Sequence, residues 1–68
     1  MPIGRSKYTY DKMKEVHQKE GKQNFTIAEV SRLTGRAIRT ESQYLRELHI
    51  QGLLKRFSED KHYVFQFA

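Results

Sequence analysis

The chain has 68 residues and no cysteine, so we expect one small domain with a marginal core, no disulfide and no thiolate metal site. No apolar run reaches the length of a membrane span and the first residues lack an apolar secretion signal, so we expect a cytoplasmic protein. The formal net charge of +5 favours a polyanionic partner: nucleic acid first, an acidic membrane or protein second.

The first seven residues contain proline, glycine, serine and two basic residues. This composition predicts a flexible basic arm over residues 1–7, followed by a folded domain over residues 8–68. Thr9 is expected to cap a first helix, with Asp11 in its first turn, where the helix dipole favours an acid. Apolar residues then recur at helical spacing until Gly21, which is expected to end the helix.

A second helix is predicted by the stretch "TIAE". Thr26 and Glu29 have the spacing of a capping box, in which each side chain bonds the backbone amide of the other residue. The apolar positions of this helix are Ile27, Val30 and Leu33. Gly35 is expected to end it, because glycine adopts the left-handed conformation at little cost.

A third helix is predicted over residues 37–51, followed by Gly52. On a helical wheel the residues expected to face the core are Ile38, Ser42, Leu45, Leu48 and His49. The residues expected to face outward are Arg36, Thr40, Gln43 and Glu47, with Arg39 and Arg46 beside them. Tyr44 lies next to the apolar face and is expected to pack.

After Gly52 the apolar period changes from helical to alternating. The segments "LLKRF" and "HYVFQF" are rich in strand-forming residues, and "SEDK" between them is typical of a hairpin tip. The sequence therefore predicts an α+β fold, with a three-helix helix-turn-helix core followed by a C-terminal β-hairpin wing.

This order of elements resembles the winged helix-turn-helix family of DNA-binding domains. The resemblance rests on "FTIAEVSRLTG" and on "YLRELHIQGLLKRF", where Leu45, Leu48, Gly52 and Leu53 match a step that is common in small bacterial repressors. The chain departs from the family at Glu41, where an apolar residue is usual. Ile38 is expected to supply that contact one turn earlier.

A second resemblance is to MerR-type regulators and phage excisionases, which share "FTIAEVSRLTG" followed by "IRT". Those folds begin at that helix and reach the Gly-Leu-Leu step sooner. The predicted first helix and the longer third helix favour the general winged-helix interpretation.

The resemblance implies a sequence-specific double-stranded DNA-binding protein, a small transcriptional regulator of bacterial, phage or plasmid type. The helix at 37–51 would enter the major groove, and the wing at 53–67 would contact flanking backbone or minor groove. A single domain offers few contacts, so a homodimer or two copies on a repeated site are expected. The candidate DNA-binding residues are Arg36, Arg39, Thr40, Gln43, Arg46, Lys55, Arg56, Lys61, His62, Arg5 and Lys7.

Other functions find less support in the sequence. The three histidines are far apart and have no cysteine partners, so no metal site is expected. No nucleophile–base pair or glycine-rich phosphate loop is present, so we expect no enzyme, no cofactor, no small-molecule ligand and no membrane partner. The alternative is a winged-helix protein-interaction module that does not read DNA sequence.

Overall fold

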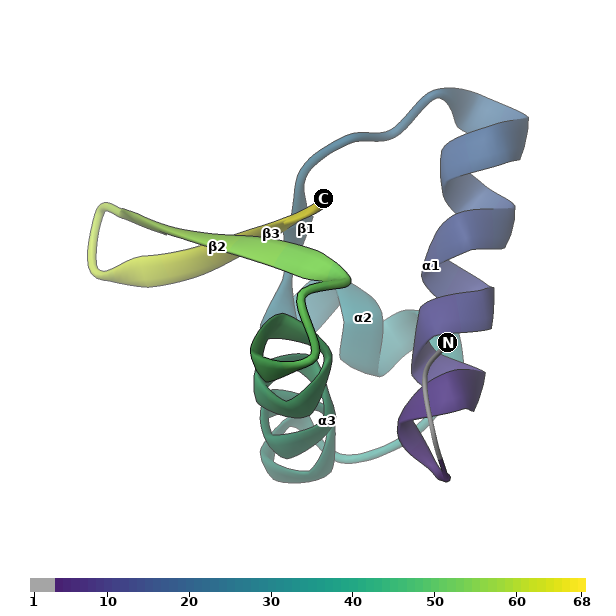
Figure 1. The fold of residues 1–68 in the computed structure, drawn as a ribbon, viewed down its shortest axis with the longest axis horizontal. Helices are drawn as coiled ribbons and strands as arrows, with labels where there is room; N and C mark the ends of the chain where they lie inside the picture. The colour runs from purple at the N-terminus through teal and green to yellow at the C-terminus, as the bar shows by residue number, and fades with distance from the viewer. Residues whose placement is uncertain (1–3) are drawn as a thin grey trace.

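The computed structural model describes residues 4–68 (Figure 1). Its elements in chain order are α1 (Ser6–Glu20), β1 (Phe25–Thr26), α2 (Ile27–Thr34), α3 (Ile38–Ile50), β2 (Leu54–Glu59) and β3 (His62–Phe67). Three helices pack together, and the β2–β3 hairpin projects from them on the side opposite α1 (Figure 1). The predicted α+β fold, with three helices followed by a C-terminal hairpin, is confirmed.

Helix α1 begins earlier than expected. Its first residue is Ser6, and the preceding Arg5 makes no side-chain cap. Thr9 therefore lies inside the helix and is fully buried, so the prediction that it caps the helix is wrong. Lys7 also belongs to α1 rather than to an arm; residues 1–3 of the predicted arm lie outside the described residues. Gly21 ends the helix with φ of 70°, as predicted.

The start of α2 is the predicted capping box. The Glu29 amide donates to the Thr26 hydroxyl at 3.2 Å, and the Thr26 amide donates to the Glu29 carboxylate at 2.9 Å. These bonds satisfy two amides that a helix start would otherwise leave without partners. Gly35 ends α2 with φ of 75°, also as predicted.

Glu29 should make the stability of the fold sensitive to acid. Burial acts to raise the pKa of Glu29, but hydrogen bonds from Lys22 and Thr26 outweigh it and hold the pKa below 4.5. Because the folded state favours the ionised form, this contribution is complete above pH 4.5 and is lost as the pH falls through the lowered pKa. Urea unfolding across this range should show a shallower acid loss for Glu29→Gln, whereas the exposed control Glu15→Gln should follow the parent protein.

The hairpin belongs to a three-stranded antiparallel sheet of order β1-β3-β2. The short strand β1 pairs with β3 at Phe25↔Phe65, which adds a strand to the expected hairpin. Glu59 faces His62 across the tip, so "SEDK" contains the turn as predicted. Both central residues, Asp60 and Lys61, have positive φ, as in a two-residue type I′ turn.

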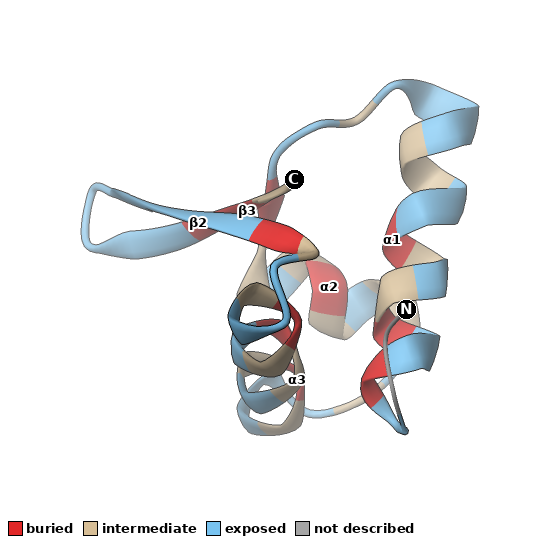
Figure 2. Ribbon diagram, viewed as in Figure 1, coloured by how far each residue is buried: buried red, intermediate tan, exposed pale blue. Residues whose placement is uncertain are grey.

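The core lies where the three helices meet the base of the sheet (Figure 2). Its buried apolar residues are Met13, Phe25, Val30, Leu45, Leu48, Leu54 and Phe65. Phe67 closes the core on the α1 side, with its ring edge-on to those of Tyr10 and Phe25. The hairpin tip carries no buried residue, so its position depends on this base.

The core-facing side of α3 differs from the prediction at two positions. Ile38 was expected to face the core, but 57% of its surface is exposed. Glu41 is fully buried instead. It lies one turn before Leu45 on the same face of the helix, so a charged residue occupies an inward position of α3.

Candidate nucleic-acid interface

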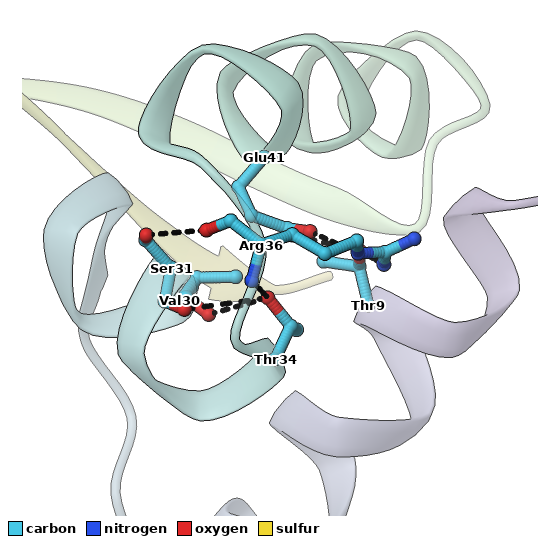
Figure 3. A network of polar contacts seen from close by, with 6 residues as sticks. All are labelled: Thr9, Val30, Ser31, Thr34, Arg36 and Glu41. Carbon is cyan, nitrogen blue, oxygen red and sulfur yellow. Dashed lines mark hydrogen bonds and ion pairs between the residues drawn. The ribbon is translucent and has the colours of Figure 1, made fainter.

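The turn between α2 and α3 is held by short-range hydrogen bonds (Figure 3). The Ser31 hydroxyl donates to the Arg36 carbonyl at 2.6 Å, and the Arg36 amide donates to the Thr34 hydroxyl at 3.3 Å. Thr34 in turn donates to the Val30 carbonyl at 3.1 Å. The first two contacts satisfy the carbonyl and the amide of Arg36 within the turn, and they fix the direction in which α3 leaves it.

A buried polar cluster of Thr9, Arg36 and Glu41 joins α1 to the start of α3 (Figure 3). The Thr9 hydroxyl donates to Glu41 Oε2 at 2.7 Å and accepts from Arg36 Nη2 at 2.6 Å. Arg36 Nε lies 2.7 Å from Glu41 Oε1; the two atoms form an ion pair but lack the alignment of a hydrogen bond. Arg36 therefore neutralises the buried carboxylate, which would be costly to bury alone.

The guanidinium of Arg36 also lies close to two aromatic rings. Its central carbon is 4.8 Å from the centroid of the Tyr8 ring and 4.7 Å from that of the Tyr44 ring. Tyr44 is thus a packing residue, as expected. Arg36 was predicted to face outward and contact DNA, but its side chain is turned back into the protein, because Glu41 needs a cation. It does not belong to the exposed candidate interface.

A groove runs between α3 and the hairpin, with a volume of about 570 Å³. It is lined by Ile27, Arg39, Ser42, Gln43, Arg46, Arg56, Tyr63 and Phe65. Helix α3 supplies Arg39, Gln43 and Arg46 from one side, and β2 supplies Arg56 from the other. The structure therefore brings together four of the predicted site residues that are separated by up to 17 positions in the sequence.

The charge of this groove is uncompensated. Its lining includes three arginines and no carboxylate. Within residues 4–68, none of these arginines forms an ion pair, whereas Arg36 and Lys22 each have an acidic partner. Cations that lie close together without counter-charges repel one another, so this arrangement favours an anionic ligand.

The hairpin residues divide between the two faces of the sheet, because alternate side chains of a strand point to opposite sides. Arg56 shares the groove face with Tyr63, and its guanidinium lies 4.7 Å from the centroid of the Tyr63 ring. The ring holds the cation toward α3. Lys55, which precedes Arg56 in β2, points to the opposite face and does not line the groove. Sequence reasoning missed Tyr63 as a site residue: its alternation with Phe65 is visible in the sequence, but its contact with Arg56 depends on the hairpin register.

The remaining predicted residues lie outside the groove. Thr40 is half-buried and on another side of α3, while Lys61 and His62 are exposed at the hairpin tip. Arg5 and Lys7 lie at the start of α1, on the far side of α3 from the hairpin (Figure 1). Lys7 is 3.4 Å from Asp11 in an exposed ion pair.

The histidines near the helix ends contact the backbone. His17 Nδ1 lies 2.7 Å from the Lys22 carbonyl oxygen, and His49 Nδ1 lies 3.0 Å from that of Leu54. In the described part of the chain, no group of three or more histidine or acidic side chains is placed to hold a metal ion. Among residues 4–68, no helix has the length and apolar composition needed to cross a membrane.

Comparisons with known proteins add no family assignment to this geometry. No model of a protein family matches the chain, and no curated protein is significantly similar to it.

Proposed function

We propose that the protein binds double-stranded DNA in a sequence-specific manner and acts as a small transcriptional regulator in the cytoplasm. One observation carries this proposal: Arg39, Arg46 and Arg56 meet without acidic partners in the groove between α3 and the hairpin. Phosphate contacts by arginine supply much of the affinity of DNA-binding proteins. The order of elements, with α1 before the helix-turn-helix, supports the general winged-helix resemblance more than the MerR or excisionase one.

The positions of the groove residues suggest separate roles. A major groove about 12 Å wide admits an α-helix, whose N-terminal half usually meets the base edges. Arg39 and Gln43 are exposed on that half of α3, and their side chains can bond guanine and adenine. Arg46 and Arg56, nearer the hairpin base, are the candidates for phosphate contacts. Lys61 and His62 at the tip would then reach flanking backbone or minor groove.

Replacing Arg39 tests the proposal. We expect Arg39→Ala to weaken binding to a selected DNA site by about tenfold or more and to reduce discrimination against random DNA, because one base contact contributes about 1–3 kcal/mol. The matched control is Lys19→Ala, which removes the same charge from an exposed position of α1. The measurement is affinity across a salt series, using sites selected from a random DNA pool. Affinity that is independent of salt, or equal losses for both variants, would contradict the proposal.

The alternative, a protein-interaction module, rests on two exposed apolar residues of α3. Ile38 is 57% exposed and Ile50 is 71% exposed. They lie at opposite ends of the helix, and the face between them is basic and polar, which suits DNA better than an apolar partner. If one protein is recovered stoichiometrically in a pull-down, requires both isoleucines and is not displaced by any DNA, this alternative is favoured.

A further inference from the structure

The outer edge of the hairpin has no partner strand. Strand β2 is at the end of the sheet, and among residues 4–68 no strand pairs with its second edge. The hairpin also projects away from the helices (Figure 1), and α3 contacts that edge at its base, where His49 bonds the Leu54 carbonyl. A free edge presents backbone donors and acceptors that can pair with another strand.

The hydrogen bonds of neighbouring residues show which groups point to that edge. The Leu53 carbonyl accepts from Ala68, on the β3 side, whereas the Leu54 carbonyl accepts from His49, on the other side. Residues that exchange hydrogen bonds across an antiparallel pair alternate along the strand. Beyond Leu54, whose carbonyl already bonds His49, the outward backbone groups of β2 therefore belong to Arg56 and Ser58.

These free groups define how two copies of β2 can pair around a two-fold axis. To form hydrogen bonds, Arg56 and Ser58 must face residues of the second copy whose amides and carbonyls also point outward. Only every second residue of β2 meets this condition, so the two-fold axis passes through a residue rather than between two residues. An axis at Arg56 would place the two copies of Arg56 opposite each other. An axis at Ser58 would place Phe57 of one copy opposite Glu59 of the other. An axis at Phe57 places Arg56 opposite Ser58 and completes four backbone hydrogen bonds.

The side chains of β2 are complementary to one another in this last register. Lys55 of one copy faces Glu59 of the other on both sides of the axis, and the Phe57 rings face each other at the centre. All three side chains are exposed, Phe57 by 46%, and Lys55 and Glu59 have no ion pair within residues 4–68. Opposite charges and aromatic rings at facing positions stabilise antiparallel pairs.

We propose that the protein forms a homodimer in which β2 pairs with β2 of a second copy, centred on Phe57. The two-fold axis is perpendicular to the sheet, so a given side chain of β2 lies on the same face of the joined six-stranded sheet in both copies. For the same reason both α3 helices lie on one side of that sheet. Both arginine-lined grooves would then face one surface. The pairing does not depend on DNA binding; the inference that it sets the symmetry of the DNA site rests on the proposed function.

Charge reversal tests the register. Lys55→Glu and Glu59→Lys should each raise the dimer dissociation constant about tenfold, because each creates two like-charged pairs across the interface. The double variant should restore it. Residues 55 and 59 are four positions apart on one extended strand, roughly 13 Å, so the rescue has to act between chains. Sedimentation equilibrium of the free protein gives the constants, which separates this result from any failure of DNA binding.

A cross-link provides a second readout in this cysteine-free chain. In the proposed register the two Phe57 Cα atoms lie about 4.5 Å apart, within disulfide reach, and the two Ser58 Cα atoms lie about 8 Å apart. Under mild oxidation Phe57→Cys should form covalent dimers at least tenfold faster than Ser58→Cys. Equal rates for the two variants, a wild-type protein that stays monomeric at every concentration, or charge variants without effect would each overturn the proposal.

Discussion

Glu41→Ala is expected to lower the free energy of unfolding by about 3 kcal/mol. Removal of one partner of a buried ion pair leaves the other without compensation, which typically costs about 3–5 kcal/mol. We expect the lower end of this range because 26% of the surface of the Arg36 side chain is exposed to solvent. A domain of this size has a total stability of roughly 3–10 kcal/mol, so the variant should be close to unfolded. Urea titration followed by circular dichroism measures the loss.

The double variant Arg36→Met/Glu41→Leu is the control for this result. Replacing both members of a buried pair by apolar residues is often neutral or stabilising, so most of the lost stability should return. The same variant tests the inward position of Arg36, because we expect its replacement to leave the proposed DNA binding unchanged. A Glu41→Ala protein as stable as the parent, or a double variant that folds but no longer binds a selected DNA site, would contradict this account.

Replacing all three groove arginines by glutamine should nearly abolish the proposed binding to DNA without weakening the fold. If each of Arg39, Arg46 and Arg56 contributes about 1.4 kcal/mol, the combined loss is about a thousandfold in affinity. The dependence of log affinity on log salt should also become less steep, by about 0.9 for each phosphate that the variant no longer neutralises. Both quantities follow from fluorescence anisotropy titrations at several salt concentrations.

The stability of the triple variant distinguishes function from folding. The three cations have no acidic partners in the described chain, so their removal should leave the unfolding midpoint unchanged or slightly higher. A matched variant that replaces Lys12, Lys14 and Lys19 of α1 by glutamine makes the same change in net charge. If this control loses as much affinity as the groove variant, binding depends on overall charge and not on the groove.

Features that depend on neighbouring residues could be predicted from the sequence. The capping box of Thr26 and Glu29 and the left-handed ends at Gly21 and Gly35 follow from local backbone chemistry. The change of apolar period after Gly52 likewise predicts the hairpin, because buried residues recur at a different spacing in helices and in strands. The order of helix and hairpin also made Arg39, Arg46 and Arg56 candidate DNA contacts, but their convergence in one groove is known only from the structure.

Features that depend on distant residues were missed for a physical reason. The start of α1 was misplaced because Thr9 has the chemistry of a cap, but its hydroxyl bonds Glu41, 32 positions away. Apolar patterning favoured Ile38 as a core residue, although Glu41 lies one turn before Leu45 on the inward face. A charge at an inward position requires a buried partner. Sequence reasoning assigned Glu41 no partner and placed Arg36 outward, so the ion pair between them is known only from the structure.

The contact of Thr9 with both Arg36 and Glu41 has a consequence for the dynamics of the domain. Fraying of the first turns of α1 would expose the carboxylate and the guanidinium together, and loosening of the start of α3 would release the Thr9 hydroxyl. Neither helix end can open without cost to the other, so the two should behave as one cooperative unit on the timescale of hydrogen exchange. The orientation of α3 is therefore maintained by a helix that lies outside the helix-turn-helix itself.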